Sequence, residues 1–164
     1  MAMRAWFAAG ATTAFTGRYV LLRVLLHRFT RDVAALNAGD HRPLLSAYRH
    51  DAVLRSGELD HRWSGVYVGR DAIEEFLRTF VASRLRGEIG AAYFGGPPWR
   101  MTTLVRFTTH VIAPNGTVRH RNRTILQVRT KWGRIVEQED FYENTARAEA
   151  FDARLRQLGL DATG

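Results

Sequence analysis

The sequence predicts one α+β domain, in which a long antiparallel meander buries one face against helices that come before it. Helical periodicity occupies residues 18–38, where apolar residues recur at three- and four-residue steps. Two β-rich runs then flank Pro114-Asn115-Gly116, and an Asn-Gly pair between such runs is a strong hairpin signal. A third β-rich run follows the Trp132-Gly133 turn. Helices followed by consecutive strands exclude an alternating β-α-β arrangement.

Each predicted helix carries a boundary signal. The helix over 18–38 should end at Gly39, because glycine readily adopts the left-handed conformation of a C-cap. A short second helix follows with Pro43 in its first turn, where the missing backbone N–H is not needed. The third helix opens at Asp71, with Glu74 at the spacing of a capping box.

The predicted strands are rich in β-branched and aromatic residues. They cover residues 52–55, 66–68, 100–112, 118–129 and 135–142. Gly95-Gly96-Pro97-Pro98 reads as a loop, and residues 145–158 read as a C-terminal helix. The domain is therefore expected over 18–158, between an N-terminal extension (1–17) and a short C-terminal tail (159–164).

The composition excludes several kinds of site. The 164-residue chain contains no cysteine, which rules out disulfides, a thiol nucleophile and cysteine-based metal sites. Its six histidines form no recognisable metal-ligand spacing, and no HExxH motif is present. We therefore expect no metal and no other cofactor.

The net charge of +8 comes almost entirely from arginine, since Lys131 is the single lysine among 24 basic residues. This bias is more typical of a GC-rich bacterial genome than of a nucleic-acid binder, so no specific nucleic-acid partner is expected. Arg23 and Arg28 interrupt the longest apolar stretches, so no membrane span is predicted. Residues 5–15 faintly resemble a signal peptide but lack a leucine-rich centre, and a cytoplasmic location is expected.

The final predicted strand carries an aspartate, Asp140, on a face that is expected to be buried. Side chains on a strand alternate between two faces, so Gln138, Asp140 and Tyr142 share one side. If that side faces the interior, a carboxylate lies inside the fold with an amide and a phenol beside it. A buried carboxylate is costly unless it is paired or used, so Asp140 is the leading candidate for a functional residue.

Four stretches in order resemble a known family: LNAGD at 36–40, YRHDAVLRSG at 48–57, GRDAIEEFLRTF at 69–80 and WGRIVEQEDFYE at 132–143. They resemble the SnoaL-like branch of the nuclear transport factor two-like superfamily, which includes ketosteroid isomerases and limonene epoxide hydrolases. The resemblance implies a cone-shaped, curved and mostly antiparallel sheet wrapped around three helices, with an apolar pocket inside. It also implies a homodimer. Members include enzymes and non-catalytic proteins, so fold alone does not fix the function.

The ketosteroid isomerase site does not carry over to this chain. The position of its general base falls on Ser56, its oxyanion-hole acid falls at or next to Ile125, and its first-helix tyrosine falls near Asp32. A hydroxyl cannot abstract a carbon-bound proton as a carboxylate can. Isomerase chemistry by that mechanism is therefore not expected.

The limonene epoxide hydrolase site carries over in part. Its final-strand aspartate matches Asp140 and its arginine matches Arg106, whereas its second aspartate falls on Thr108. Its water-holding tyrosine and asparagine fall on Leu54 and Ser56. SnoaL-like cyclases also place an acid/base aspartate on the final strand, and Asp140 resembles that residue.

The same alignment assigns the inward faces of two further strands. Arg106, Thr108 and His110 are expected on one, and Asn122 and Thr124 on the next. The expected pocket also includes Gln138, Tyr142, Leu54, Ser56, Trp63, Phe76 and Phe80.

Two functions remain open. One is a small enzyme that uses Asp140 as general acid/base on a small apolar molecule, with Arg106 or His110 stabilising developing negative charge. The other is a non-catalytic ligand-binding or dimerisation module. In either case Asp140 is expected to contact the Arg106 or Asn122 side chain.

Overall fold

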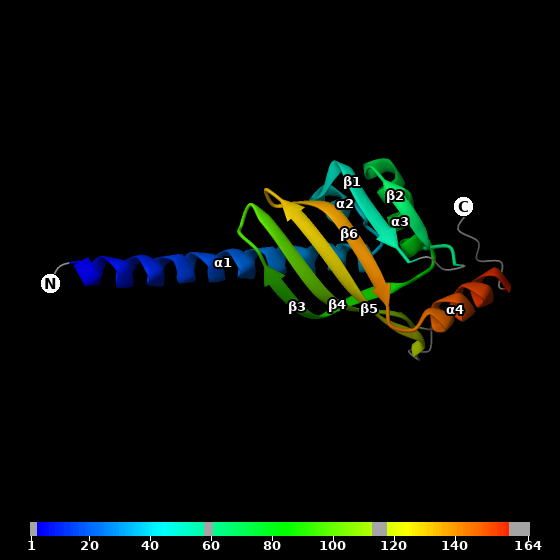
Figure 1. Ribbon diagram of the computed structural model, residues 1–164. Helices are drawn as coiled ribbons and strands as arrows, with labels where there is room; N and C mark the ends of the chain where they lie inside the picture. The colour runs from blue at the N-terminus through cyan, green and yellow to red at the C-terminus, as the bar shows by residue number, and fades with distance from the viewer. Residues whose placement is uncertain (1–2, 58–60, 113–117, 158–164) are drawn as a thin grey trace.

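The computed structural model describes residues 3–57, 61–112 and 118–157 and contains four helices and one six-stranded sheet in those ranges (Figure 1). In chain order the elements are α1 (Met3–Asn37), α2 (Arg42–Ala47), β1 (Tyr48–Ser56), β2 (Gly65–Val68), α3 (Arg70–Ala82), β3 (Arg86–Gly95), β4 (Arg100–Ile112), β5 (Val118–Lys131), β6 (Arg134–Tyr142) and α4 (Thr145–Gln157). The predicted α+β class with a curved, mostly antiparallel sheet is confirmed.

The strand order in the sheet is β2-β1-β6-β5-β4-β3. Strands β3 to β6 form an antiparallel meander, and β1 then pairs in parallel with β6. The parallel pairing brings Leu54 beside Gln138 and Ser56 beside Asp140. The predicted turn at Pro114-Asn115-Gly116 lies outside the described residues. The strands on either side of it pair antiparallel, as expected for a hairpin.

The sequence prediction lacked β3, so the meander has four strands where three were expected. The strand contains Gly87 and Gly90, which have low β propensity and hide the usual signal. Glycine at position 87 has a structural reason. A Cβ built there would lie 2.1 Å from the Phe107 ring, so the ring packs directly against the backbone of β3.

Two helix starts differ from the predictions. Helix α1 begins at Met3 rather than near residue 18, and its N-terminal part projects beyond the sheet (Figure 1). Helix α3 has Gly69 as its N-cap, with a φ of 85°, and no side chain caps it. The predicted capping box of Asp71 and Glu74 is therefore wrong. Glu74 instead pairs with His41, the residue before α2, at 3.1 Å.

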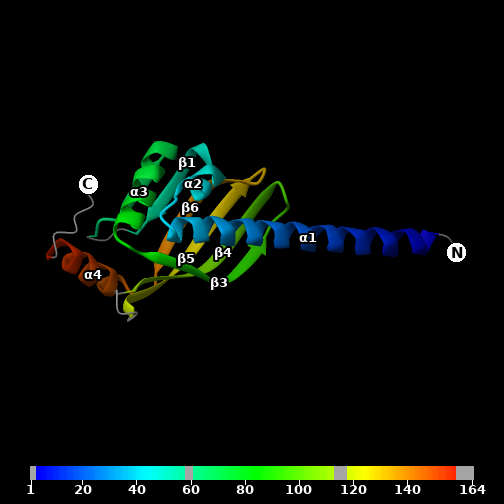
Figure 2. The same ribbon diagram turned by 180° about the vertical axis from the view of Figure 1, so that it is seen from behind.

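The core lies between one face of the sheet and the helices α1, α2 and α3, which cover that face (Figure 2). Residues Val33 and Leu36 of α1 and Ile73 and Leu77 of α3 are buried there. Helix α1 is also fastened to the edge of the sheet through Asn37. Its side-chain amide donates to the Gly87 carbonyl at 2.8 Å and accepts from the Gly87 N–H at 2.7 Å.

Helix α4 lies apart from this layer and covers one end of the meander (Figure 1). Within the described ranges, no helix combines the length and apolar character needed to cross a bilayer.

Candidate functional site

A cavity of about 70 Å³ lies between the inner face of the sheet and the helices. A single water needs roughly 10–15 Å³ on this scale, so the cavity has room for several waters or a small organic group. Its apolar wall includes Phe29, Val33, Leu36, Leu44, Trp63, Phe76, Leu77, Phe80, Leu85, Phe107, Leu126, Ala148 and Phe151. Polar side chains reach it from the strands, mainly from β5 and β6. The cavity is called the Asp140 cavity below.

The polar side chains of β6 are arranged as a connected chain. Gln138 and Asp140 both point inward because they are two residues apart on one strand. The Tyr48 hydroxyl donates to Gln138 Oε1 at 2.5 Å, and Gln138 Nε2 donates to Asp140 Oδ1 at 2.8 Å. The Tyr48 bond fixes which end of the amide faces the carboxyl group. Asp140 therefore receives a hydrogen bond of defined direction.

Burial dominates the acidity of Asp140. The residue is 7% exposed, and desolvation raises the pKa of its carboxyl from 3.8 to about 7. The Gln138 bond acts against this increase, and the charge of Glu139 adds to it. A carboxyl group with a pKa near 7 exchanges protons at neutral pH. This property is characteristic of a general acid/base.

Tyr142 and Ser56 form a second polar pair next to Asp140. Their oxygens lie 2.9 Å apart, across the parallel junction of β6 and β1. Burial raises the pKa of Tyr142 well above its ordinary value, and it does the same for Tyr48. Both phenols therefore remain neutral over the physiological range and can serve as hydrogen-bond donors.

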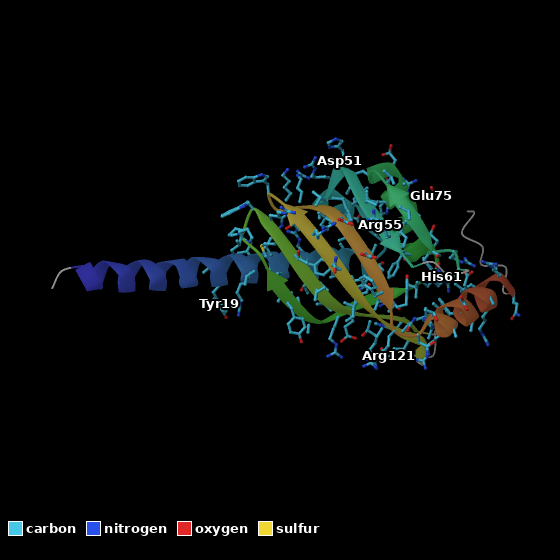
Figure 3. All side chains as sticks on the ribbon, viewed as in Figure 1. Tyr19, Asp51, Arg55, His61, Glu75 and Arg121 are labelled. Atoms are coloured by element: carbon cyan, nitrogen blue, oxygen red, sulfur yellow. The ribbon has the colours of Figure 1, made fainter. Side chains whose placement is uncertain are left out.

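Two buried histidines that the sequence analysis did not select contribute to this part of the structure. His120 of β5 lines the cavity and stacks on Phe151 with ring centroids 4.0 Å apart. Burial and then the charge of Arg147 lower its pKa to about 4, so the imidazole is neutral near pH 7. His61 makes an edge contact with Tyr142 at 5.3 Å, and Figure 3 shows it on the side of the domain next to α4. Inward alternation on β5 with Asn122 was the signal that could have identified His120.

Helix α4 closes one side of the cavity with Phe151. The Phe151 ring stacks on Trp63, with ring centroids 5.8 Å apart and the planes 9° apart. The same ring also stacks on His120. An ion pair between Arg62 and Asp152, both largely buried, ties the helix to the segment that follows β1. The cavity is therefore bounded by the sheet and by α4, which the Arg62–Asp152 ion pair holds in place.

The predicted inward face of β4 is wrong by one residue. The strand turns Phe107 and Thr109 toward the cavity. Arg106, Thr108 and His110 consequently belong to the opposite face, and Arg106 is exposed beside the exposed Ile125. The physical reason is the cost of desolvating a guanidinium group in an apolar interior, compared with burying a phenyl ring. Arg106 and His110 are thus not placed to act on a ligand in this cavity.

The expected contact of Asp140 with Arg106 or Asn122 is also wrong. Arg106 faces outward, and the partner of Asp140 is Gln138. Asn122 does line the cavity, but its amide nitrogen donates to the Asn144 carbonyl at 3.0 Å. Its Oδ1 accepts from the Arg123 N–H, also at 3.0 Å. Asn122 therefore fastens the start of α4 to β5.

The remaining predicted pocket residues fall into two groups. Those that line the cavity are Trp63, Phe76, Phe80, Asn122, Thr124, Gln138 and Tyr142. Leu54 and Ser56 are fully buried but are not part of its wall. Among the described residues, the Thr124 hydroxyl and the Trp63 indole nitrogen have no hydrogen-bond partner. These two buried groups are available to a polar atom of a ligand. Within the same ranges, no three metal-binding side chains come together.

No protein-family model matches the chain, and no curated protein matches it significantly. Solved structures do match. An NTF2-like protein from Burkholderia pseudomallei is 20% identical with a TM-score of 0.56, over 80% of this chain and 95% of its own. An NTF2-like protein with a cystatin-like fold from Novosphingobium aromaticivorans is 18% identical with a TM-score of 0.59, over 87% and 94%.

A third similar structure is the epoxide hydrolase/cyclase-like enzyme SalBIII, described in pyran ring formation in the polyether salinomycin. It is 17% identical with a TM-score of 0.54, over 76% of this chain and 94% of its own. At these identities the similarity shows the fold, which is that of NTF2-like proteins, in agreement with the resemblance seen in the sequence.

Proposed function

We propose that the protein binds a small, largely apolar molecule in the Asp140 cavity and that Asp140 acts on it as a general acid/base. The reaction is of the cyclase, isomerase, hydrolase or dehydratase type and needs no cofactor. The observation that carries this proposal is the buried carboxyl group at the cavity wall, with its pKa raised to about 7. The NTF2-like fold, which SalBIII shares, supports it.

The neighbours of Asp140 suit this role. Gln138 holds one carboxyl oxygen, which orients the group without adding a charge that would fix its protonation state. Asp140 then removes a proton from one atom of the substrate and returns it to another, so the carboxyl group is unchanged after each turnover. The Tyr142 hydroxyl and the Thr124 hydroxyl are donors for a substrate oxygen that gains negative charge.

The alternative is a non-catalytic ligand-binding module of the same fold. The chain of bonds from Tyr48 through Gln138 to Asp140 favours it, because a hydrogen-bonded network can also serve to satisfy a buried carboxyl group. In this case the carboxyl group recognises a hydrogen-bond donor on the ligand and no bond is broken.

Asp140→Asn distinguishes the two functions. The amide oxygen still accepts the Gln138 bond, but the side chain can no longer take up a proton. Binding is measured by fluorescence of anilinonaphthalene sulfonate, and turnover by screening epoxides and activated carbonyl compounds with mass-spectrometric detection. We expect unchanged dye affinity and a loss of turnover of at least about 100-fold, typical for removal of a general base. A variant that keeps full turnover would refute the role of Asp140.

A matched control is Glu139→Gln. It removes the neighbouring carboxylate on the same strand, which alternation turns to the opposite face. We expect turnover to persist in this variant. Equal losses in both variants would indicate a general effect on β6 rather than catalysis by Asp140.

A further inference from the structure

A second cavity adjoins the Asp140 cavity along α1. Its volume is about 90 Å³, and its wall includes Asp32, Ala92, Thr103 and Val128. It is called the Asp32 cavity below. Phe29 of α1 is part of the wall of both cavities. One aromatic side chain therefore lies between two spaces that are both largely apolar.

The strands show how close the two spaces are. On β4, Val105 lines the Asp32 cavity and the next inward residue, Phe107, lines the Asp140 cavity. On β5, Val128 lines the Asp32 cavity and Leu126 lines the Asp140 cavity. Successive inward residues of a strand are about 7 Å apart. The separation between the cavities is therefore about one layer of side chains.

We propose that the two cavities together hold one elongated hydrocarbon chain, with its reactive end at Asp140 and its tail in the Asp32 cavity, and that Phe29 moves aside to admit the tail. This inference rests on the proposed function and names its ligand class. The α1 residues that line the two cavities run from Leu25 to Leu36, which corresponds to about 16 Å along the helix axis. A compact molecule would leave half of this length unused.

The part of the Asp32 cavity around Asp32 is suited to an uncharged tail. Asp32 is buried, and its Oδ1 accepts bonds from Arg31 at 2.9 and 3.1 Å. The charge of Asp32 is thus matched by a guanidinium group of its own helix. Around Asp32 the tail then meets groups such as the Thr103 side chain instead of an uncompensated carboxylate. Arg28 also belongs to the wall of this cavity, and its side chain is exposed.

The test is a homologous series of straight-chain alcohols, from butanol to dodecanol, that displace bound anilinonaphthalene sulfonate. Burying one methylene group contributes about 0.8 kcal/mol, so affinity should rise about fourfold per carbon while the chain enters apolar space. In the wild-type protein this rise should continue to the long members of the series. In Thr103→Phe, which fills the Asp32 cavity, it should stop at a shorter chain.

Thr102→Phe is the matched control, because it is the same chemical change on the exposed neighbour of Thr103. We expect it to leave the whole series unchanged. Phe29→Ala should strengthen binding of long alcohols relative to short ones, since it removes the ring between the cavities, and an equal effect on all chain lengths would count against the inference.

Three results would overturn the inference. One is the same chain-length limit in the wild type and in Thr103→Phe. Another is an equal effect of Thr102→Phe and Thr103→Phe, and the last is the absence of any alcohol binding. If the wild type and Thr103→Phe have the same chain-length limit but still bind short alcohols, the proposed function remains intact. Failure of the proposed function would appear instead as full turnover in Asp140→Asn.

Discussion

Burial acts in opposite directions on Asp140 and His120, which line the same cavity. It raises the pKa of Asp140 to about 7 and lowers that of His120 to about 4. The folded protein therefore binds more protons at Asp140 than the unfolded chain does, and fewer at His120. Between about pH 4 and 6.5 the two contributions to the free energy of unfolding change in opposite directions and partly cancel.

Asp140→Asn should unmask the contribution of His120. With the aspartate removed, the free energy of unfolding should rise as pH increases from 4 to 6.5, because the folded protein excludes a proton that the unfolded histidine binds. Above pH 7 the variant should be more stable than the wild type by up to roughly 4 kcal/mol, since no ionised carboxylate is buried. Urea unfolding at several pH values measures both effects. A variant less stable than the wild type at pH 8 would contradict this account.

His120→Phe should show the opposite slope. Only Asp140 then contributes, and stability should fall as pH rises from about 4 to 7, through the range in which the unfolded carboxyl group has lost its proton and the folded one retains it. The phenyl ring keeps the stack on Phe151. Parallel pH profiles for the wild type and this variant would show that His120 is not the opposing group.

The residue-scale predictions from sequence succeeded where the two faces of a strand differ strongly. On β6, the inward placement of Gln138 and Asp140 follows from alternation. On β4 the contrast is weaker, because Thr102 and Thr103 are adjacent and point to opposite faces. A pattern of similar residues does not fix the register, and the assignment of Arg106 was taken from an alignment that the packing of Phe107 overrules.

At the scale of elements, the contact of β3 with β4 depends on Gly87. We expect Gly87→Ala to destabilise the protein by about 1–3 kcal/mol, because the added methyl group would overlap the Phe107 ring and force it or the strand to move. Gly17→Ala in α1 is the control. Nothing lies near its missing Cβ, and alanine favours a helix, so this change should be neutral or stabilising by up to about 1 kcal/mol. Thermal unfolding compares the two, and equal effects would contradict the packing argument.

The attachment of α4 to the rest of the domain depends on Asp152, which forms ion pairs with Arg62 and Arg156. Asp152→Asn should destabilise the helix by about 3 kcal/mol, the typical consequence of breaking a buried pair. Hydrogen exchange followed by mass spectrometry should then show faster exchange in 145–157 than elsewhere. Arg156→Gln removes the more exposed partner and should have a much smaller effect. Uniformly faster exchange over all elements would mean that Asp152 supports the whole domain.

The sequence predicted most elements but not their full extent. Periodicity identified α3 and the part of α1 that packs on the sheet, since burial there demands an apolar stripe. It gave no signal for residues 3–17 of α1, the part of the helix that extends beyond the sheet. Strand β3 was missed for a related reason. Its glycines are explained by a ring from β4, which is a contact between distant segments.

For the whole molecule, we predict a homodimer through the outer face of the meander. Exposed apolar side chains lie on that face across the four strands: Tyr93, Leu104, Ile125 and Phe141. Ile125 and Phe141 are direct neighbours on β5 and β6. Light scattering after size exclusion should give twice the monomer mass at micromolar concentration. Phe141→Glu should give the monomer, because it places a charge in the contact.

Trp132→Glu provides the control for this prediction. Of the large apolar residues whose exposure the structure describes, Trp132 is the most exposed, at 75%, but it lies in the turn before β6 and outside the face. The dimer should survive this change. A monomeric wild-type protein would refute the prediction directly.

The arrangement of the whole fold could be predicted from four short stretches, which cover the end of α1, the first strand, most of α3 and the last strand. The two cavities could not. Their shapes depend on how rings from α1, β4 and α4 pack against one another, and the Phe29 side chain contributes to both. Such packing is set by contacts between residues far apart in sequence, which periodicity does not record.

The pairing of Asn37 with Gly87 bears on how the protein behaves in crowded solution. Strand β3 is at the edge of the sheet, where unpaired N–H and C=O groups can recruit a strand from another chain and begin an aggregate. The Asn37 amide occupies both backbone groups of Gly87, much as a neighbouring strand would. The register shift between Ile89 and Ala91 interrupts the edge further along. The same side chain that anchors α1 therefore also limits pairing of this edge with a strand of another chain.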